Sequence, residues 1–186
     1  MGMGLLKSGT NEVIATTEFN AAPMGIIFKD GVARMVLFSG SHTANNVEKN
    51  GWLVANFVFD PILYVKTAFE DLPNDAFIEE TLNGRKIHRL KDTDAWAAFT
   101  TTIEKKTTEA LMVVLTLEKE IIENVSLHPV NRGFNNLIDM TVHATRYMMN
   151  RDPLLKGQID YHAGIVRKCG GKRELEALEL LMRYIS

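Results

Sequence analysis

Short apolar and β-branched stretches alternate with turn residues along roughly the first sixty positions of the chain. Four of these stretches, at 13–17, 24–28, 33–39 and 52–59, have the length and composition of β-strands. Their even spacing and tight connections predict a β-barrel rather than a parallel sheet. Between the third and fourth stretches, residues 43–49 form a predicted helix, which the Asn50-Gly51 pair would end.

Two turn signals separate the first three predicted strands. Asn-Ala-Ala-Pro at 20–23 predicts a tight corner, and Lys29-Asp30-Gly31 predicts a hairpin turn. Small residues at such a corner let backbone amides approach a flat ring closely. We therefore expect the corner to be a place where a planar ligand lies against the chain.

The middle of the chain has a weaker pattern. Residues 61–69 and 75–82 fit short helices, and 84–90 fits a strand. Asp92 or Thr93 is a suitable N-cap for a helix that would run through Trp96 and Phe99. The stretch 110–123 is rich in Leu, Val and Ile, which favours a bent strand or a pair of strands returning to the barrel. A helix is the alternative there.

From about Ser126 the pattern becomes helical. Asp152-Pro153 supplies a cap and a first helical residue, and Gly170-Gly171 ends that helix. We expect a barrel domain at 1–125 and a helical region at 126–186, packed on the barrel and with a dimer partner as a further contact. Two apolar faces carry this interpretation: Phe134, Leu137, Ile138, Thr141, Thr145 and Met148 within 133–150, then Leu175, Leu178, Met182 and Ile185.

Composition narrows the possible partners. The 186 residues are 46% hydrophobic and 24% charged, which is ordinary for a globular protein. A net charge of −2 gives no electrostatic reason to expect nucleic acid or an anionic membrane surface as a partner. No apolar run approaches the roughly 20 residues that span a bilayer. The single cysteine, Cys169, excludes an internal disulfide and fits a reducing cytoplasm.

The order of the pieces between 11 and 56 indicates a binding site for flavin mononucleotide (FMN). The start of a helix offers unpaired N–H groups and a positive dipole end, which suit a phosphate. Arg34 on the preceding strand would add positive charge. Candidate contacts to the ring edge are Thr16, Thr17, Asn20, Ala21 and Ala22, with Pro23 as apolar surface; candidate contacts to the phosphate are Ser39, Ser41, His42 and Thr43, with Asn46 in the same helix.

The same residues resemble the FMN-binding split-barrel superfamily, which includes flavin reductases and pyridoxamine phosphate oxidases. Flavin reductase-like members carry a Thr-rich first strand, an Asn-x-Ala-Pro corner, a Ser-x-x-Thr helix start and an Asn that ends the next strand. In this chain the last of these is Asn56. The whole chain resembles an archaeal family catalogued as domain of unknown function 447, in which the barrel is followed by segments similar to 131–135 and 143–146.

This resemblance implies a mainly β fold with helices: an FMN-binding split β-barrel followed by a helical C-terminal segment. It also implies a homodimer with FMN at or near the interface. Many relatives place Lys-Asp-Thr at the phosphate, whereas this chain has Ser41-His42-Thr43. The charge would then be met by Arg34, or by Arg132 or Arg151 from the helical region.

Two functions are open at this point. One is a flavoprotein oxidoreductase of flavin reductase-like type, with a small-molecule electron donor or acceptor and an unknown substrate. The other is a non-catalytic flavin-binding carrier, sensor or structural protein. The chain offers no candidate for a catalytic acid or base. Its five histidines lack the spacing of a zinc site, and no cysteine cluster exists, so we expect no metal.

Overall fold

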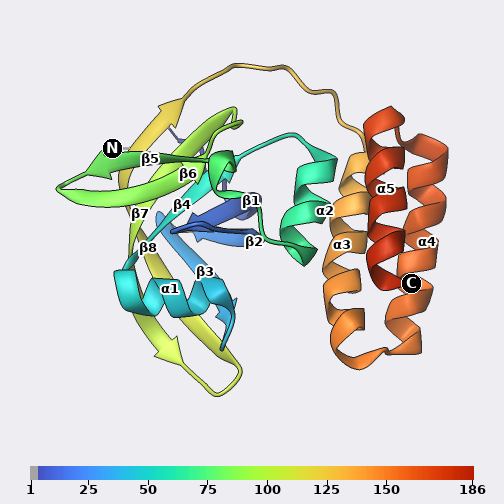
Figure 1. Cartoon of the computed structure of the whole chain (residues 1–186), viewed down its shortest axis with the longest axis horizontal. Coiled ribbons are helices and arrows are strands. Elements are labelled where there is room, and N and C mark those ends of the chain that lie inside the picture. Colours follow the sequence, from blue (N-terminus) through green and yellow to red (C-terminus); the bar gives the residue numbers. More distant parts are fainter. Residues whose placement is uncertain (1–3) are drawn as a thin grey trace. The chain divides into compact units, whose positions relative to one another are not determined.

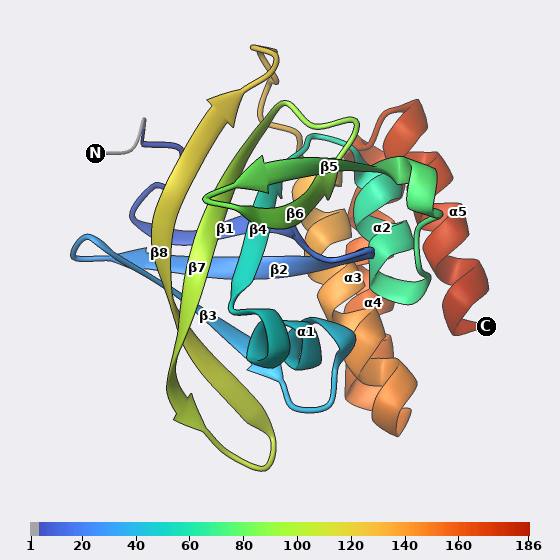
Figure 2. The same cartoon turned by 60° about the vertical axis from the view of Figure 1, so that its left-hand side comes forward.

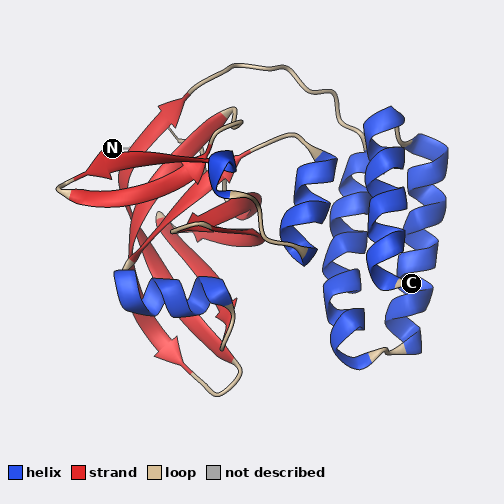
Figure 3. Ribbon diagram, viewed as in Figure 1, coloured by secondary structure: helices blue, strands red, loops and turns tan. Residues whose placement is uncertain are grey.

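The computed structural model describes residues 4–186, which form two compact units. The first unit consists of the described chain up to Val58 together with Asp71–Ser126, and it is rich in strands (Figure 3). The second consists of Phe59–Glu70 and Leu127–Ser186, and its regular structure is helical. The expected barrel followed by helices is confirmed. Residues 59–70 interrupt the barrel unit and contribute a helix to the helical unit.

The barrel unit is a closed antiparallel barrel in which the strand order is β1-β2-β3-β8-β7-β4 (Figures 1 and 2). Apolar side chains from every strand fill its interior, among them Ile26, Met35, Leu53 and Phe99. Burial of this apolar surface is the main force that holds the strands in register. The barrel strands are β1 (Gly9–Thr17), β2 (Asn20–Lys29), β3 (Val32–Phe38), β4 (Trp52–Phe57), β7 (Ala95–Lys106) and β8 (Ala110–Ile122).

Two smaller elements complete this unit. Helix α1 (His42–Asn50) connects β3 to β4 and packs Ala44 and Val47 against the barrel interior. The hairpin of β5 (Phe77–Leu82) and β6 (Arg85–Leu90) follows the short 3-10 helix η1 (Asn74–Ala76). This hairpin forms a second sheet of its own.

The helical unit contains α2 (Pro61–Phe69), α3 (Arg132–Asn150), α4 (Pro153–Cys169) and α5 (Lys172–Ile185). Leu137, Met140, Ile159 and Leu181 are fully buried in its interior. A Cβ on Gly133 would lie 2.5 Å from the Cα of Gly170, so glycine is required where α3 begins beside the end of α4. Among the described residues, no helix combines the length and the apolar character needed to cross a bilayer.

Most of the predicted elements are confirmed, including the Asp30-Gly31 turn, whose two residues have φ of 51° and 77°. The predicted helix through Trp96 and Phe99 is wrong, because these residues lie in β7. Ala97 and Phe99 face the barrel interior, while Trp96 and Ala98 belong to a second apolar cluster with Ile87 of the hairpin. A strand buried on both faces has no alternating pattern, which is why the sequence did not reveal it.

Two further predictions are also wrong. The predicted helix at 75–82 is η1 followed by β5, which pairs with β6 from Phe77 onward. The predicted corner at 20–23 lies within β2, and the turn falls instead at Glu18 and Phe19. Glu18 has a positive φ of 53°, a conformation that is uncommon for residues other than glycine and asparagine.

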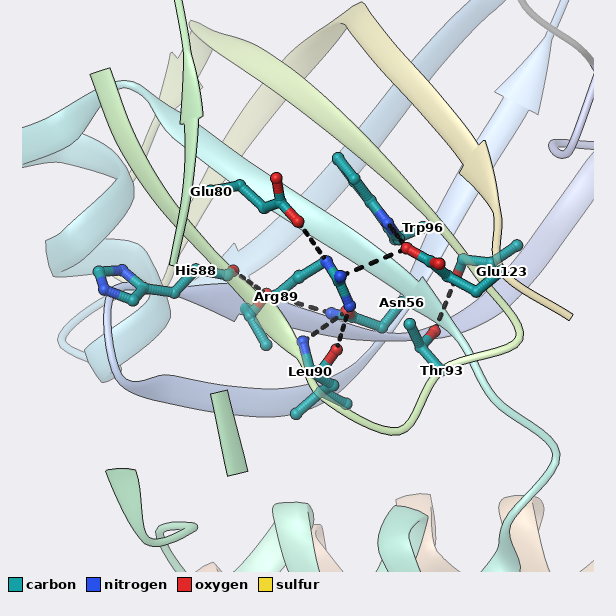
Figure 4. Close-up of polar contacts among 10 residues, drawn as sticks. Asn56, Glu80, His88, Arg89, Leu90, Thr93, Trp96 and Glu123 are labelled. Carbon is teal, nitrogen blue, oxygen red and sulfur yellow. Dashed lines mark hydrogen bonds and ion pairs between the residues drawn. The ribbon is translucent and has the colours of Figure 1, made fainter. Parts of the chain in front are cut away.

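A buried amide connects the hairpin to the barrel (Figure 4). The Asn56 Oδ1 accepts a hydrogen bond of 2.8 Å from the Leu90 N–H, while its Nδ2 donates to the Ile14 carbonyl at 2.8 Å. The same Nδ2 donates to Thr16 Oγ1 at 3.1 Å, and the Thr16 hydroxyl donates to the His88 carbonyl at 2.6 Å. Asn56 therefore joins β1, β4 and β6 through one side chain that is completely buried.

Two charged residues of β6, Arg85 and Arg89, also hold the hairpin. Arg89 pairs with Glu80 at 3.0 Å and with Glu123 at 3.3 Å, and its guanidinium lies 5.5 Å from the centre of the Trp96 ring (Figure 4). The Trp96 indole N–H donates to Glu123 at 2.9 Å. Arg85 adds a pair to Glu118 at 2.8 Å. The position of the hairpin is thus fixed by polar contacts at both of its ends.

We expect Asn56→Ala to lower the free energy of unfolding by roughly 3 kcal/mol, because it leaves the Leu90 N–H without its side-chain acceptor and removes the bonds from Asn56 to Ile14 and Thr16. Urea unfolding followed by circular dichroism measures this loss. The matched control is Asn45→Ala on the exposed face of α1, which we expect to change stability by no more than about 0.5 kcal/mol. Equal losses in the two variants would contradict the role given to Asn56.

Candidate functional site

One polar face of α1 holds the turn between β1 and β2. Thr43, Asn46 and Asn50 are spaced by three and four residues, so they share that face. The Asn46 Nδ2 donates to the Thr17 carbonyl at 3.1 Å and to Thr17 Oγ1 at 3.2 Å. The Asn50 Nδ2 donates to Glu18 Oε1 at 2.8 Å. The adjacent face of α1, with Ala44 and Val47, packs into the barrel, so the helix is fixed on two faces.

Asn20 links the first residue of β2 to the same helix. Its Nδ2 donates to Thr43 Oγ1 at 3.0 Å and lies 3.5 Å from Thr17 Oγ1. Thr17, Asn20, Thr43 and Asn46 thus form a hydroxyl–amide cluster that joins three elements. Thr43 and Thr17 are buried, and Asn20 and Asn46 are half-buried. The structure brings these four predicted site residues together.

The first turn of α1 presents donors next to this cluster. The Ser41 side chain caps the helix by accepting the Ala44 N–H at 3.2 Å. Within residues 4–186, which the structure describes, the backbone N–H groups of His42 and Thr43 have no acceptor. Because the Thr43 oxygen already accepts from Asn20, its hydroxyl proton is left to donate elsewhere. These donors at the positive end of the helix form a site suited to an anion.

A cavity of about 450 Å³ lies beside the cluster. His42 lines it, and its Nδ1 lies 4.0 Å from the Asp71 carboxylate, with both side chains largely exposed. The described lining includes no lysine or arginine, so the positive helix end and His42 are the groups there that favour an anion. The lining residues are Glu18, Phe19, Asn20, His42, Asn45, Asn46, Asp71, Leu72 and Asn74.

The first part of β2 has a free edge. β2 pairs with β1 along its whole length, whereas the recorded pairs with β3 begin only at Ile26, opposite Met35. In residues 20–25 the backbone groups that point toward β3 are therefore outside the ladder. Ala21, Ala22 and Pro23 lie on this segment, where small side chains and a proline without an N–H are tolerated. A planar ring with donors and acceptors along its edge fits beside such a strand.

Other predicted site residues are engaged elsewhere. Arg34 forms a two-atom pair with Glu104, at 3.0 Å from its Nε, and this contact raises the pKa of Arg34 and lowers that of Glu104. The Ser39 hydroxyl donates to the Thr107 carbonyl at 3.2 Å. Arg132 begins α3 in the helical unit. Thr16 and Asn56 serve the junction with the hairpin. Arg34, Ser39, Thr16 and Asn56 therefore make their side-chain contacts outside the hydroxyl–amide cluster.

The sequence analysis missed two residues that position this site. Asn50 was interpreted only as part of a helix-ending pair, and Glu18 was not considered, although the two side chains bond each other. The spacing of Thr43, Asn46 and Asn50 was the available signal, because three polar side chains share one face of the helix, next to the buried Ala44 and Val47. No sequence pattern near α1 indicated which segment would lie against that face.

Comparison with solved structures places the barrel in a known class. The fold is a split β-barrel like that of a putative flavin reductase with a split barrel domain from Shewanella frigidimarina. That structure has a TM-score of 0.52 and 12% sequence identity, and the match covers 64% of this chain and 70% of the other. At this level of identity the likeness concerns the fold alone.

The chain belongs to the family described as protein of unknown function (DUF447). The model of the family's N-terminal domain matches residues 11–124, and that of its C-terminal part matches residues 131–183. The chain is similar to an FMN-bound protein of the same family from Methanosarcina mazei, with a TM-score of 0.90 and 36% identity over 96% of each chain. An uncharacterized protein of Methanocaldococcus jannaschii is 28% identical over 199 residues, covering 95% of this chain and 98% of that protein.

Proposed function

We propose that this chain binds FMN at the start of α1 and acts as an FMN-dependent oxidoreductase of flavin reductase-like type. One observation carries the proposal: a family member of the same fold and similar length is FMN-bound. The free donors of the first turn of α1 support this position for the phosphate.

The phosphate of FMN needs several donors and a compensating positive charge. The N–H groups of His42 and Thr43 and the Thr43 hydroxyl are the donors in this proposal. The positive end of α1 supplies charge, and the imidazole of His42 is a further donor. Arg132 and Arg151 stay candidates for an additional cation. Arg34 is a weaker candidate, because Glu104 already neutralises its guanidinium.

The ring of FMN would lie along the free edge of β2. Its alternating donors and acceptors would meet the backbone groups of residues 20–25, and Pro23 would offer apolar surface. The bound flavin would supply the electron transfer, while the protein positions the ring and excludes water. A reduced nicotinamide is the electron donor we propose, and the substrate is a small molecule still to be identified.

We also propose that the protein is a homodimer, with FMN near the interface. Ile27, Val36 and Phe38 share the outer face of β2 and β3, and their side chains are 44%, 43% and 60% exposed. Exposed apolar residues gathered on a sheet are typical of an interface. The Phe38 carbonyl accepts the Ser41 N–H at 3.2 Å, so this patch adjoins the cap of α1.

We expect Thr43→Val to weaken FMN binding at least tenfold, because a hydrogen bond to a charged group contributes about 1.5–3 kcal/mol. Fluorescence titration of the flavin-free protein measures the change. Thr43→Ser should retain most of the affinity, since it keeps the hydroxyl. Ser39→Ala is the control, because its hydroxyl bonds to Thr107. An unchanged affinity in Thr43→Val would place the phosphate elsewhere.

The oxidoreductase assignment predicts that NADH or NADPH bleaches the visible absorption of the FMN-loaded protein when oxygen is absent. Admission of oxygen should restore the colour. Stopped-flow absorbance measures both steps, with free FMN as the control for reduction in solution. A flavin that stays oxidised with both donors would favour the carrier or sensor function while leaving FMN binding intact.

The homodimer proposal predicts that Phe38→Asp shifts the protein toward monomer, since a carboxylate would be buried at the contact. Sedimentation velocity measures the change in mass. The control is Val125→Asp, which alters a side chain that is 79% exposed and lies after the last strand of the barrel. A wild-type protein that is monomeric at all concentrations tested would contradict the proposal.

A further inference from the structure

The β5–β6 hairpin is attached to the barrel through side chains. Among the described residues its two strands pair with each other, in a sheet separate from the barrel ladder. The attachment includes hydrogen bonds of Asn56 and Thr16, ion pairs of Arg85 and Arg89, and apolar contacts of Ile87. A segment outside a continuous ladder opens at a lower free energy than a strand within one. We therefore expect the hairpin to open while the barrel stays folded.

His88 lies where the hairpin meets the β1–β2 turn. The centroid of its ring is 4.3 Å from that of Phe19 in the turn and 6.3 Å from that of Trp52 in β4. Phe19 also makes an edge contact with Phe77 of β5, at 5.8 Å between centroids. The imidazole thus belongs to a group of ring contacts that joins the hairpin to the turn and to β4.

The imidazole of His88 is closed off from water and unpaired. Both ring nitrogens are buried and have no hydrogen-bond partner among the described residues, and the residue is 8% exposed. Glu79 Oε2 lies 3.8 Å from Nε2, too far for a hydrogen bond. Burying a charged group without hydrogen bonds costs far more than burying a neutral one. The closed arrangement therefore favours the neutral ring.

The surroundings of the ring act in the same direction. Burial is the main cause that lowers the pKa of His88 from its ordinary value of 6.5. Glu79 on β5 and Glu18 in the turn oppose this shift, and Lys86 on β6 adds to it. The opposition is limited, because Glu79 already pairs with Lys86 at 2.9 Å.

The other segments around His88 contribute no free charge next to the ring. Trp52 of β4 is uncharged, and α1 contributes the amide of Asn50, which donates to Glu18. Lys49 of α1 lies 3.6 Å from Glu18, so this carboxylate has two partners. Arg85 lines the same cavity as His88, and its guanidinium pairs with Glu118.

An open hairpin would expose the ring to water and return its pKa to the ordinary value. Because the pKa of the closed state is lower, the open state binds more protons once the pH falls below about 6.5. The free energy of opening therefore decreases with acidification, until the pH reaches the pKa of the closed state. Above neutral pH the ring is neutral in both states, and opening does not depend on its titration.

We propose that His88 is a pH-sensitive switch between the hairpin and the β1–β2 turn. The neutral ring keeps Phe19 and the hairpin together, and protonation of the ring loosens both. A cavity of about 330 Å³ beside these residues gives the two rings room to separate. Phe19 also lines the cavity beside α1, so the loosened turn would change that wall. The switch uses none of the donors of α1 and does not depend on bound FMN.

Hydrogen–deuterium exchange of the full chain, followed by NMR, measures the opening. The Leu90 N–H, which bonds to Asn56, reports on the hairpin, and the amides of β3 and β8 are the reference. After correction for intrinsic exchange, protection of Leu90 should fall at least about threefold from about pH 7.5 to about pH 5, with less change in the reference. Constant protection of Leu90, or an equal loss in β3 and β8, would overturn the proposal.

His88→Phe tests the ring itself. Phenylalanine keeps an aromatic ring beside Phe19 but does not titrate, so protection of Leu90 should no longer depend on pH in this range. The control is His143→Phe in α3, where burial also lowers the pKa of a histidine, and it should keep the pH dependence of Leu90. An acid-induced loss that persists in folded His88→Phe, or disappears in His143→Phe, would count against the switch.

Glu79→Gln tests the switch without altering His88, and the Glu79 side chain is 46% exposed, so the fold should tolerate the change. Removing the carboxylate takes away an attraction for the protonated ring and frees Lys86, and both effects lower the pKa of His88 in the closed state further. The ratio of Leu90 protection between the two pH values should rise at least about twofold over wild type. An equal or smaller ratio would refute the proposal even if His88→Phe fails to fold.

Discussion

One buried amide ties the β5–β6 hairpin to two strands of the barrel. Asn56 uses both ends of its side chain, since its oxygen accepts from β6 and its nitrogen donates to β1, which leaves no polar atom unpaired in a site closed to water. An apolar residue of the same size would strand the Leu90 N–H, and an aspartate would bury a charge. Thr16 extends this contact, because it accepts from Asn56 and donates to the backbone carbonyl of His88. The backbone of β6 is therefore held at His88 by the side chain of Thr16 and at Leu90 by that of Asn56.

Helix α1 plays the corresponding part on the other side of the β1–β2 turn. Its apolar face packs into the barrel and its polar face bonds to Thr17, Glu18 and Asn20. A helix fixed on two faces cannot roll, so the direction of its first N–H groups is determined by contacts farther along the same helix. The positive φ of Glu18 belongs to this arrangement, since a sparsely populated conformation persists where surrounding bonds hold it. The β1–β2 turn is in this way fixed as part of the wall of the cavity beside α1.

The sequence predicted the parts of the fold whose signals are local. The first four strands, α1 and the helices after Ser126 have clear periodicity and clear end signals, such as Gly51 with φ of 69° after α1. The strand β7 was missed because it is covered by the core on one face and by the hairpin on the other. The cluster of Thr17, Asn20, Thr43 and Asn46 was predicted as a set of candidates, but its internal bonds were not. The partner of Arg34 is 70 residues away, and the partners of Asn56 lie on β1 and β6, so no local pattern could reveal them.

The charge distribution along α1 agrees with the proposed phosphate site, although no lysine lines the cavity there. Residues 42–50 are all described, and their first turn contains no acidic residue that would neutralise the positive end of the helix. At the C-terminal end of α1, the Lys49 ammonium lies 3.6 Å from the Glu18 carboxylate. Because no acidic residue lies in the first turn, the positive end of the helix and its free N–H groups are available to a ligand. The nearby Asp71 is largely exposed, so water screens its repulsion more than it screens a contact at the backbone amides.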